Sequence, residues 1–269
     1  MGMIAKSILS IIKAKSKSTI KKFIRWTMTS KMLVFPRRIF ARIIIYGIQT
    51  KGLVLISYSD SDRKKVIELT HKIKNEREML LADNEAYQLF MAVRRTEKIQ
   101  GDIAEVGVYK GGSAKIICEA KGNKFLHLFD TFNGIPNVEE IDKVKFFKGQ
   151  YKASIEEVKN YLKQYNNVLI YEGIFPDDVV PEGDSRFSFI HLDVDTYKST
   201  LKCLKYFYPR INPGGIIISH DYISAPGVKK AIDEFFKDKI EPVVELSGSQ
   251  CLIVKSGLSD DYLAGNLGV

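Results

Sequence analysis

The stretch "DIAEVGVYKGGSAKIICEAKG", residues 102–122, decides the fold. It starts with a mostly apolar run around Glu105, which is typical of a strand buried on both faces of a sheet. Glycines at 107, 111 and 112 follow, and they open a helix that we expect to end at Gly122. A strand, a glycine turn and a helix in this order predict the first unit of an α/β fold.

The alternation continues along the chain. Apolar runs separated by helical patterns predict a doubly wound parallel sheet, whose ligands bind at the carboxyl ends of the strands. Two further runs around "GSQ", residues 248–250, predict an antiparallel hairpin. We expect this α/β domain over 99–269, preceded by a helical cap or lid over 53–98. The expected strands after the first lie at 125–131, 167–173, 187–195 and 214–222.

Charge is divided unevenly along the sequence. The whole chain carries 41 Lys and Arg against 32 Asp and Glu, a net charge of +9. Twelve of the basic residues and none of the acidic ones lie in residues 1–52, so the remainder is mildly acidic. This asymmetry points to a polyanionic partner for a basic arm rather than for the α/β domain.

The basic arm, residues 1–52, begins with an amphipathic helical pattern. Isoleucines at 4, 8, 11 and 12 share one helix face, and lysines lie opposite. This pattern is typical of a helix in an anionic membrane interface, which residues 1–30 would contact. The alternative is that the arm packs as a lid or in a homo-oligomer. No uncharged run reaches about 18 residues, so we expect no spanning helix, and no reader motif predicts nucleic-acid binding.

The three cysteines, Cys118, Cys203 and Cys251, are far apart in the sequence. They form neither a CxxC pair nor a disulfide framework, which indicates a reducing compartment. We therefore expect buried thiols and a cytoplasmic protein, with the membrane surface as the peripheral alternative.

The glycine turn excludes two common nucleotide-binding motifs. Its spacing differs from GxGxxG, and no Lys-Ser/Thr follows the glycines, so neither a dinucleotide fingerprint nor a phosphate loop is present. Glu105, ahead of the turn, suits a ligand with a positive amino group, although a tight turn alone also uses such glycines. Asp130 comes 23 residues after Gly107, where nucleotide folds place a carboxylate for ribose hydroxyls. A turn or cap role is the alternative for Asp130.

Two carboxylates lie at the end of the fourth expected strand. Asp193 and Asp195 are two positions apart in "HLDVDTYKST", residues 191–200, so they point the same way at the strand end. Two like charges so placed repel each other, so we expect a functional role that offsets the repulsion. His220 and Asp221 lie at the end of the fifth expected strand, at the same edge of the sheet.

Six motifs occur in order over about residues 84–255: "AEVGVYKGGSA", "DTFNGIP", "EGIFPD", "HLDVDTYKST", "YPRINPGGIIISHDY" and "PGVKKAIDEFF". Together they resemble the class I S-adenosylmethionine-dependent methyltransferases. More narrowly, the set is similar to the macrocin O-methyltransferase family, which includes enzymes that methylate sugars of macrolides and of novobiocin. The resemblance implies a seven-stranded methyltransferase sheet with an antiparallel last strand, and it leaves the basic N-terminal helical extension outside.

The resemblance also implies a set of site residues. Asp195 matches the proposed general base, and Asp193 and Asp221, with the position of His220, match the ligands of a magnesium ion. Asp130 matches the residue that binds the ribose of S-adenosylmethionine. The positions that match the rest of its binding site are Glu105, Gly107, Tyr109, Gly111, Gly112, Ser113, Gly173, Ile174 and Asp193.

The sequence departs from the family at residue 220. Family members commonly have two adjacent Asp residues before a Tyr, whereas this chain has "HDY" at 220–222. Magnesium prefers oxygen ligands, while imidazole suits zinc, iron or manganese sites better. Either His220 is not a ligand and water completes the metal shell, or the metal preference is shifted.

The resemblance implies a metal-assisted O-methyltransferase that acts on a hydroxyl of a sugar, or of a glycosylated or lipid-linked molecule. A divalent cation stabilises the alkoxide, and a nearby carboxylate accepts the proton. A phenolic or catechol acceptor is one alternative. A membrane-associated protein that binds the cofactor without catalysis is the other.

Overall fold

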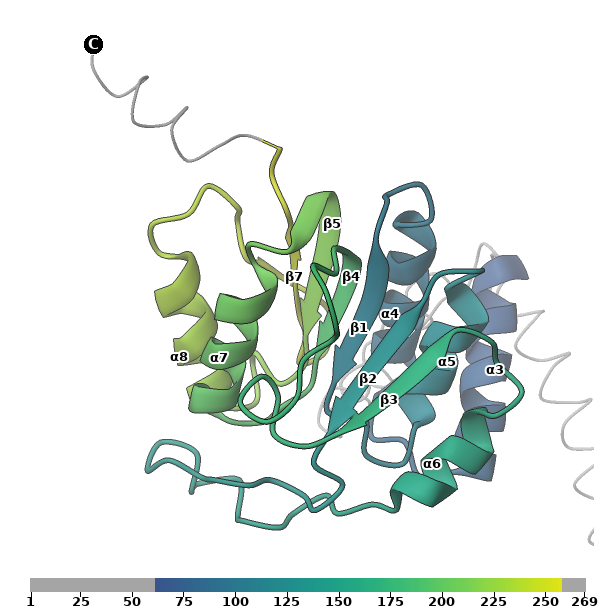
Figure 1. Ribbon diagram of the computed structural model, residues 1–269, viewed down its shortest axis with the longest axis horizontal. Coiled ribbons are helices and arrows are strands. Elements are labelled where there is room, and N and C mark those ends of the chain that lie inside the picture. The colour runs from purple at the N-terminus through teal and green to yellow at the C-terminus, as the bar shows by residue number, and fades with distance from the viewer. Residues whose placement is uncertain (1–60, 258–269) are drawn as a thin grey trace, which may run out of the picture. The chain divides into compact units, whose positions relative to one another are not determined.

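The computed structural model describes residues 61–257, which form a seven-stranded sheet with helices on both faces (Figure 1). The strand order is β3-β2-β1-β4-β5-β7-β6. The first five of these strands are parallel, and β7 runs antiparallel to both β5 and β6. The predicted sheet, with its antiparallel last strand and hairpin, is confirmed. The strands are β1 (Asp102–Val106), β2 (Leu126–Asp130), β3 (Val168–Glu172), β4 (Phe187–Leu192), β5 (Ile211–Ser219), β6 (Val244–Glu245) and β7 (Cys251–Val254).

Helices cover the sheet in two layers because each strand of its centre is apolar on both faces. The helices α3, α4 and α5 pack together on one face, and α7 and α8 pack on the other (Figure 1). Each layer encloses its own cluster of buried apolar side chains. The helices are α3 (Ser61–Glu76), α4 (Asp83–Arg95), α5 (Gly112–Ala120), α6 (Ile155–Leu162), α7 (Tyr197–Phe207) and α8 (Pro226–Phe236).

The strands end earlier than the sequence predicted, because residues with positive φ turn the chain. Gly107 has φ of 88° just after β1, Asp195 has φ of 64° after β4, and Asp221 has φ of 60° after β5. A side chain at such φ values is unfavourable, and Asp tolerates them better than most residues. The turns therefore fall at the residues for which the sequence predicted chemistry.

The helical cap or lid predicted over 53–98 is interrupted within its described residues, 61–98. Residues 77–82 leave the helix between α3 and α4. At the start of α4, the backbone N–H of Ala82 donates to Glu85 Oε2 over 2.8 Å, which is one half of a capping box. The interruption places an irregular segment beside the glycine turn that follows β1.

The three cysteines are buried and unpaired, as expected from the sequence. The predicted basic arm, residues 1–52, lies outside the described residues, as do residues 53–60 of the predicted cap. Within residues 61–257, no helix combines the length and apolar character that crossing a membrane requires.

β1 and β4 approach each other closely at their carboxyl ends. The N–H of Asp193 donates to the carbonyl oxygen of Val106 over 2.9 Å, and this continues the ladder past β4. A Cβ atom on Gly107 would lie 1.9 Å from the carbonyl oxygen of Asp193. Only glycine fits there, so the turn is demanded by backbone packing before any ligand is considered.

Gly107→Ala should therefore lower the free energy of unfolding by about 3 kcal/mol or more, because it adds a backbone clash to an unfavourable φ. Gly149→Ala is the matched control, because Gly149 has φ of +83° with nothing within 4 Å of its Cβ position. The control should cost only about 1–2 kcal/mol. Urea unfolding of both variants measures the difference, and equal losses would show that the contact with Asp193 imposes no constraint.

Candidate active site

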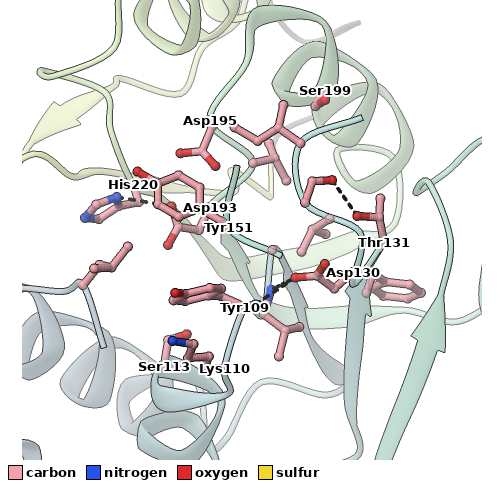
Figure 2. A pocket seen from close by; sticks show the side chains of 18 of the residues that line it. Tyr109, Lys110, Ser113, Asp130, Thr131, Tyr151, Asp193, Asp195, Ser199 and His220 are labelled. Carbon is pink, nitrogen blue, oxygen red and sulfur yellow. Dashed lines mark hydrogen bonds and ion pairs between the residues drawn. The ribbon is translucent and has the colours of Figure 1, made fainter. Parts of the chain in front are cut away.

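A cavity of about 360 Å³ opens at the carboxyl ends of β1, β2, β4 and β5. This size suits a small-molecule ligand. Figure 2 shows Asp193, Asp195 and His220 grouped near one another, with Asp130 and Tyr109 also on the wall. Of the residues predicted from the sequence, those lining the cavity are Gly107, Tyr109, Gly112, Ser113, Asp130, Gly173, Ile174, Asp193, Asp195, His220 and Asp221.

The segment 77–82 forms part of the cavity wall. A Cβ atom on Gly112 would lie 2.7 Å from Cβ of Met79, so the absence of a side chain lets this segment press against the start of α5. Glu78 accepts hydrogen bonds from the Tyr109 hydroxyl over 3.0 Å and from Lys110 Nζ over 2.6 Å. The apolar contact at Met79 and the hydrogen bonds of Glu78 thus hold the segment against the glycine turn.

Asp130 holds the backbone of the glycine turn. Its Oδ2 accepts from the N–H groups of Val108 and Tyr109 over 2.7 and 2.8 Å, and its Oδ1 accepts from the N–H of Phe132 over 2.7 Å. Burial raises the pKa of Asp130 above its ordinary value, while the three N–H groups act in the opposite direction. Asp130 is therefore a turn residue, one of the two roles that the sequence left open, and it also faces the cavity.

Glu105 and Gly111 are not part of the cavity wall. The Glu105 side chain is fully buried, and its Oε1 lies 2.9 Å from Nδ1 of His191, which is also fully buried. Burial raises the pKa of Glu105, and His191 and Ser113 oppose that rise. Glu105 therefore lies behind the cavity wall, whereas Ser113 lines the cavity. Gly111 has a left-handed φ at the start of α5. The structure does not bring either residue to the cavity surface with the others.

Asp193, His220 and Asp221 each offer one ligand atom, and these atoms lie within 4.8 Å of one another. Nδ1 of His220 lies 3.2 Å from Oδ1 of Asp193 and 3.5 Å from Oδ2 of Asp221. That buried nitrogen has a hydrogen bond to neither. Ligands about 2.1 Å from one cation and at right angles to each other are about 3 Å apart, so the spacing fits a single divalent ion.

The charges of this group depend on one another. Burial lowers the pKa of His220, but Asp193, Asp221 and Glu85 outweigh burial and hold that pKa well above its ordinary value. Burial acts to raise the pKa of Asp221, but His220 and Lys145 hold it well below its usual range. A cation bound between the carboxylates would take the place of the imidazolium charge.

Asp195 lies beside this group, and its charge is less well compensated. Burial raises the pKa of Asp195 well above its ordinary value, and repulsion from Asp193 and Asp221 adds to the rise. Asp195 and Asp221 both have left-handed φ. Non-glycine residues in that conformation are held by their surroundings, and they cluster at functional sites.

Glu85, on α4, is a site residue that the sequence analysis missed. Its Oε2 lies 3.3 Å from Nε2 of His220, and its Oε1 accepts from the N–H and hydroxyl groups of Ser249 over 2.7 and 2.8 Å. Contacts with His220 and Ser249 lower the pKa of Glu85 to about 2, although burial opposes them. No signal in the sequence links these residues, because 135 positions separate Glu85 from His220.

The segment between β2 and α6 also contributes to the cavity. Its Lys145 and Tyr151 line the wall. Lys145 Nζ donates to Oδ1 of Asp221 over 2.8 Å. Asp142, which is buried, accepts from the N–H of Tyr197 at the start of α7 over 3.1 Å. These contacts attach the segment to the edge of the sheet that carries the cavity (Figure 1).

The family model described as macrocin-O-methyltransferase (TylF) matches residues 79–246. This chain belongs to that family. The match begins in the segment before α4 and ends after β6, so it contains all the residues that line the cavity except Glu78.

Two relatives give the family context. The demethyldecarbamoylnovobiocin O-methyltransferase of Streptomyces niveus is 27% identical over 51% of this chain and 58% of its own length. The 8-demethyl-8-(2,3-dimethoxy-alpha-L-rhamnosyl)-tetracenomycin-C 4'-O-methyltransferase of Streptomyces olivaceus is 29% identical over 46% of this chain and 54% of its own length. The chain therefore matches little more than half the length of these curated relatives.

A solved structure is similar in fold. The structure of the O-methyltransferase NovP superimposes with a TM-score of 0.57 at 23% sequence identity, and the match covers 66% of this chain and 82% of that one. This likeness supports the sheet order and helix layers described above.

Proposed function

We propose that this chain is an S-adenosylmethionine-dependent O-methyltransferase that methylates a sugar hydroxyl on a glycosylated or lipid-linked molecule. The observation that carries the proposal is Asp195, held beside the Asp193, His220 and Asp221 group in the cavity of a macrocin O-methyltransferase family member. The name of the S. olivaceus relative specifies a rhamnosyl tetracenomycin as acceptor, which favours a sugar over a phenol.

The cofactor would lie along the carboxyl ends of β1 and β2. Gly107, Gly112 and Ser113 would hold its methionine part together with Tyr109, while Asp130 would accept from a ribose hydroxyl. The other positions assigned to it are Glu105 and Gly111, which do not line the cavity, and Asp193, Gly173 and Ile174, which do. Gly173 and Ile174 would border the adenine. When bound, S-adenosylmethionine supplies a methyl group on a positively charged sulfur.

The divalent ion fits the residues that are present. Asp193 and Asp221 are hard oxygen donors, and His220 adds a buried nitrogen without a hydrogen bond. When bound, such a cation lowers the pKa of a coordinated hydroxyl and orients it. The protein's own task is then to place the acceptor oxygen and to remove its proton.

Asp195 is the group that removes the proton in this proposal. Its carboxylate takes the hydroxyl proton as the acceptor oxygen forms its bond to the methyl carbon. The electrons of the broken sulfur–carbon bond stay on sulfur. The raised pKa of Asp195 gives it more basicity than an ordinary carboxylate.

Asp195→Asn should lower kcat by about 10²- to 10⁴-fold, since a general base contributes about that much. The dissociation constant for S-adenosylmethionine should change by less than about threefold, because residue 195 acts on the acceptor. Labelled cofactor and a panel of glycosides, lipid-linked sugars and phenols provide the assay, and calorimetry provides the affinity.

The matched control is Asp238→Asn, which neutralises an exposed carboxylate away from the cavity. It should leave both quantities unchanged. A turnover for Asp195→Asn within about threefold of the unmodified chain would exclude the role of Asp195 as base. Methyl transfer to phenols alone would exclude the sugar acceptor.

The arm gives a reason to include lipid-linked acceptors. Residues 1–52 carry twelve basic residues and no acidic ones, which suits the anionic surface of a cytoplasmic membrane leaflet. We therefore propose a cytoplasmic protein that binds the membrane periphery through residues 1–30.

Deletion of residues 1–30 should abolish flotation with anionic liposomes and leave the described domain folded. Flotation of the full chain should weaken as salt rises, because each basic residue contributes about 1 kcal/mol through screened attraction. Equal flotation of the two proteins would contradict membrane binding by the arm and favour packing as a lid or in a homo-oligomer.

A further inference from the structure

His220 has two ring nitrogens with different surroundings. Nδ1 is buried and points at Asp193 (Figure 2). It also lies 3.5 Å from Oδ2 of Asp221. Nε2 points the other way, toward Oε2 of Glu85 at 3.3 Å and Oγ of Ser249 at 3.1 Å. Nδ1 therefore faces the candidate ion site, and Nε2 makes polar contacts with α4 and with the turn between β6 and β7.

Glu85 is fixed in place by several backbone and side-chain donors. Ala82 N–H donates to its Oε2, and both the N–H and the hydroxyl of Ser249 donate to its Oε1. The turn passes so close that a Cβ atom on Gly248 would lie 2.6 Å from Oε1. The carboxylate therefore has a set position and orientation before any ion binds.

This arrangement selects one tautomer of the imidazole. A carboxylate can only accept hydrogen bonds, and the Ser249 hydroxyl already donates its hydrogen to Glu85. The hydrogen of a neutral His220 ring therefore belongs on Nε2, between these acceptors. The lone pair of Nδ1 is then free and points at the carboxylates of Asp193 and Asp221.

We propose that Glu85 is a positioning residue that makes His220 Nδ1 a metal ligand, so that the site selects a first-row transition ion such as Mn²⁺ or Co²⁺ over Mg²⁺. The proposal rests on the metal-assisted function proposed above and extends it to the identity of the ion. Imidazole nitrogen binds transition ions better than Mg²⁺, which prefers oxygen and retains water. A histidine ligand whose other nitrogen donates to a carboxylate is more basic and has a fixed ring orientation.

The test compares Mn²⁺, Co²⁺ and Mg²⁺ binding to the full chain by calorimetry, with S-adenosylmethionine binding measured on the same samples. Glu85→Gln keeps the volume but places an amide donor toward Nε2, so that the ring proton moves to Nδ1. Mn²⁺ affinity should fall by about 10- to 100-fold, the usual effect of changing a partner behind a metal ligand. Glu97→Gln, an exposed change two residues beyond α4, should have no effect.

His220→Asp is the matched comparison, because the carboxylate of an aspartate ligand has no ring tautomer for residue 85 to select. The ratio of Mn²⁺ to Mg²⁺ affinity should fall by about tenfold relative to the unmodified chain. In the His220→Asp background, Glu85→Gln should change Mn²⁺ affinity by less than about threefold. The visible absorption of bound Co²⁺ should also differ between the unmodified chain and His220→Asp, since one nitrogen ligand is lost.

Several outcomes would overturn the proposal. Equal Mn²⁺ binding by the unmodified chain and a folded Glu85→Gln would exclude Glu85 as a positioning residue. An Mn²⁺ to Mg²⁺ ratio that His220→Asp leaves unchanged would exclude nitrogen ligation, and this comparison remains if Glu85→Gln does not fold. Failure of all three ions to bind would also remove metal assistance, while normal S-adenosylmethionine binding would preserve the cofactor part of the proposed function.

Discussion

The close approach of β1 and β4 at Gly107 is the constraint on which the site depends. Because residue 107 has no Cβ, the backbone of Asp193 reaches the end of β1. Asp130 then holds the glycine turn from the other side, because it accepts from the backbone N–H groups of Val108 and Tyr109. The strand order reverses between β1 and β4, so the turns on either side diverge and leave a cavity at the sheet edge.

That arrangement creates electrostatic repulsion between carboxylates. Asp193, Asp195 and Asp221 bring three carboxylates to the edge of one cavity, and two of them have left-handed φ. In the absence of an ion, His220 and Lys145 offset part of the repulsion. Burial raises the pKa of Asp195, and repulsion from Asp193 and Asp221 adds to the rise, which suits Asp195 to proton transfer. The crowding imposed by the strand ends therefore contributes to both the repulsion and the reactivity.

The fold and the location of the site were predictable because they follow from local patterns. Apolar runs between helices define the sheet, and acids at strand ends such as Asp130 and Asp193 define its reactive edge. Tertiary contacts were not predictable in this way. Glu105 lies one layer behind the cavity because it pairs with His191 on the next strand. Glu85 reaches His220 only because the helical region breaks at residues 77–82 and α4 turns back across the sheet.

We propose that one cation binds between the carboxyl ends of β4 and β5, with His220 Nδ1 as a ligand. Anomalous diffraction from crystals grown with Mn²⁺ and S-adenosylhomocysteine tests it most directly. We expect one anomalous peak within about 2.3 Å of Asp193, His220 Nδ1 and Asp221, with Nε2 still facing Glu85. A peak bounded only by carboxylates and water, with the imidazole turned away, would contradict it.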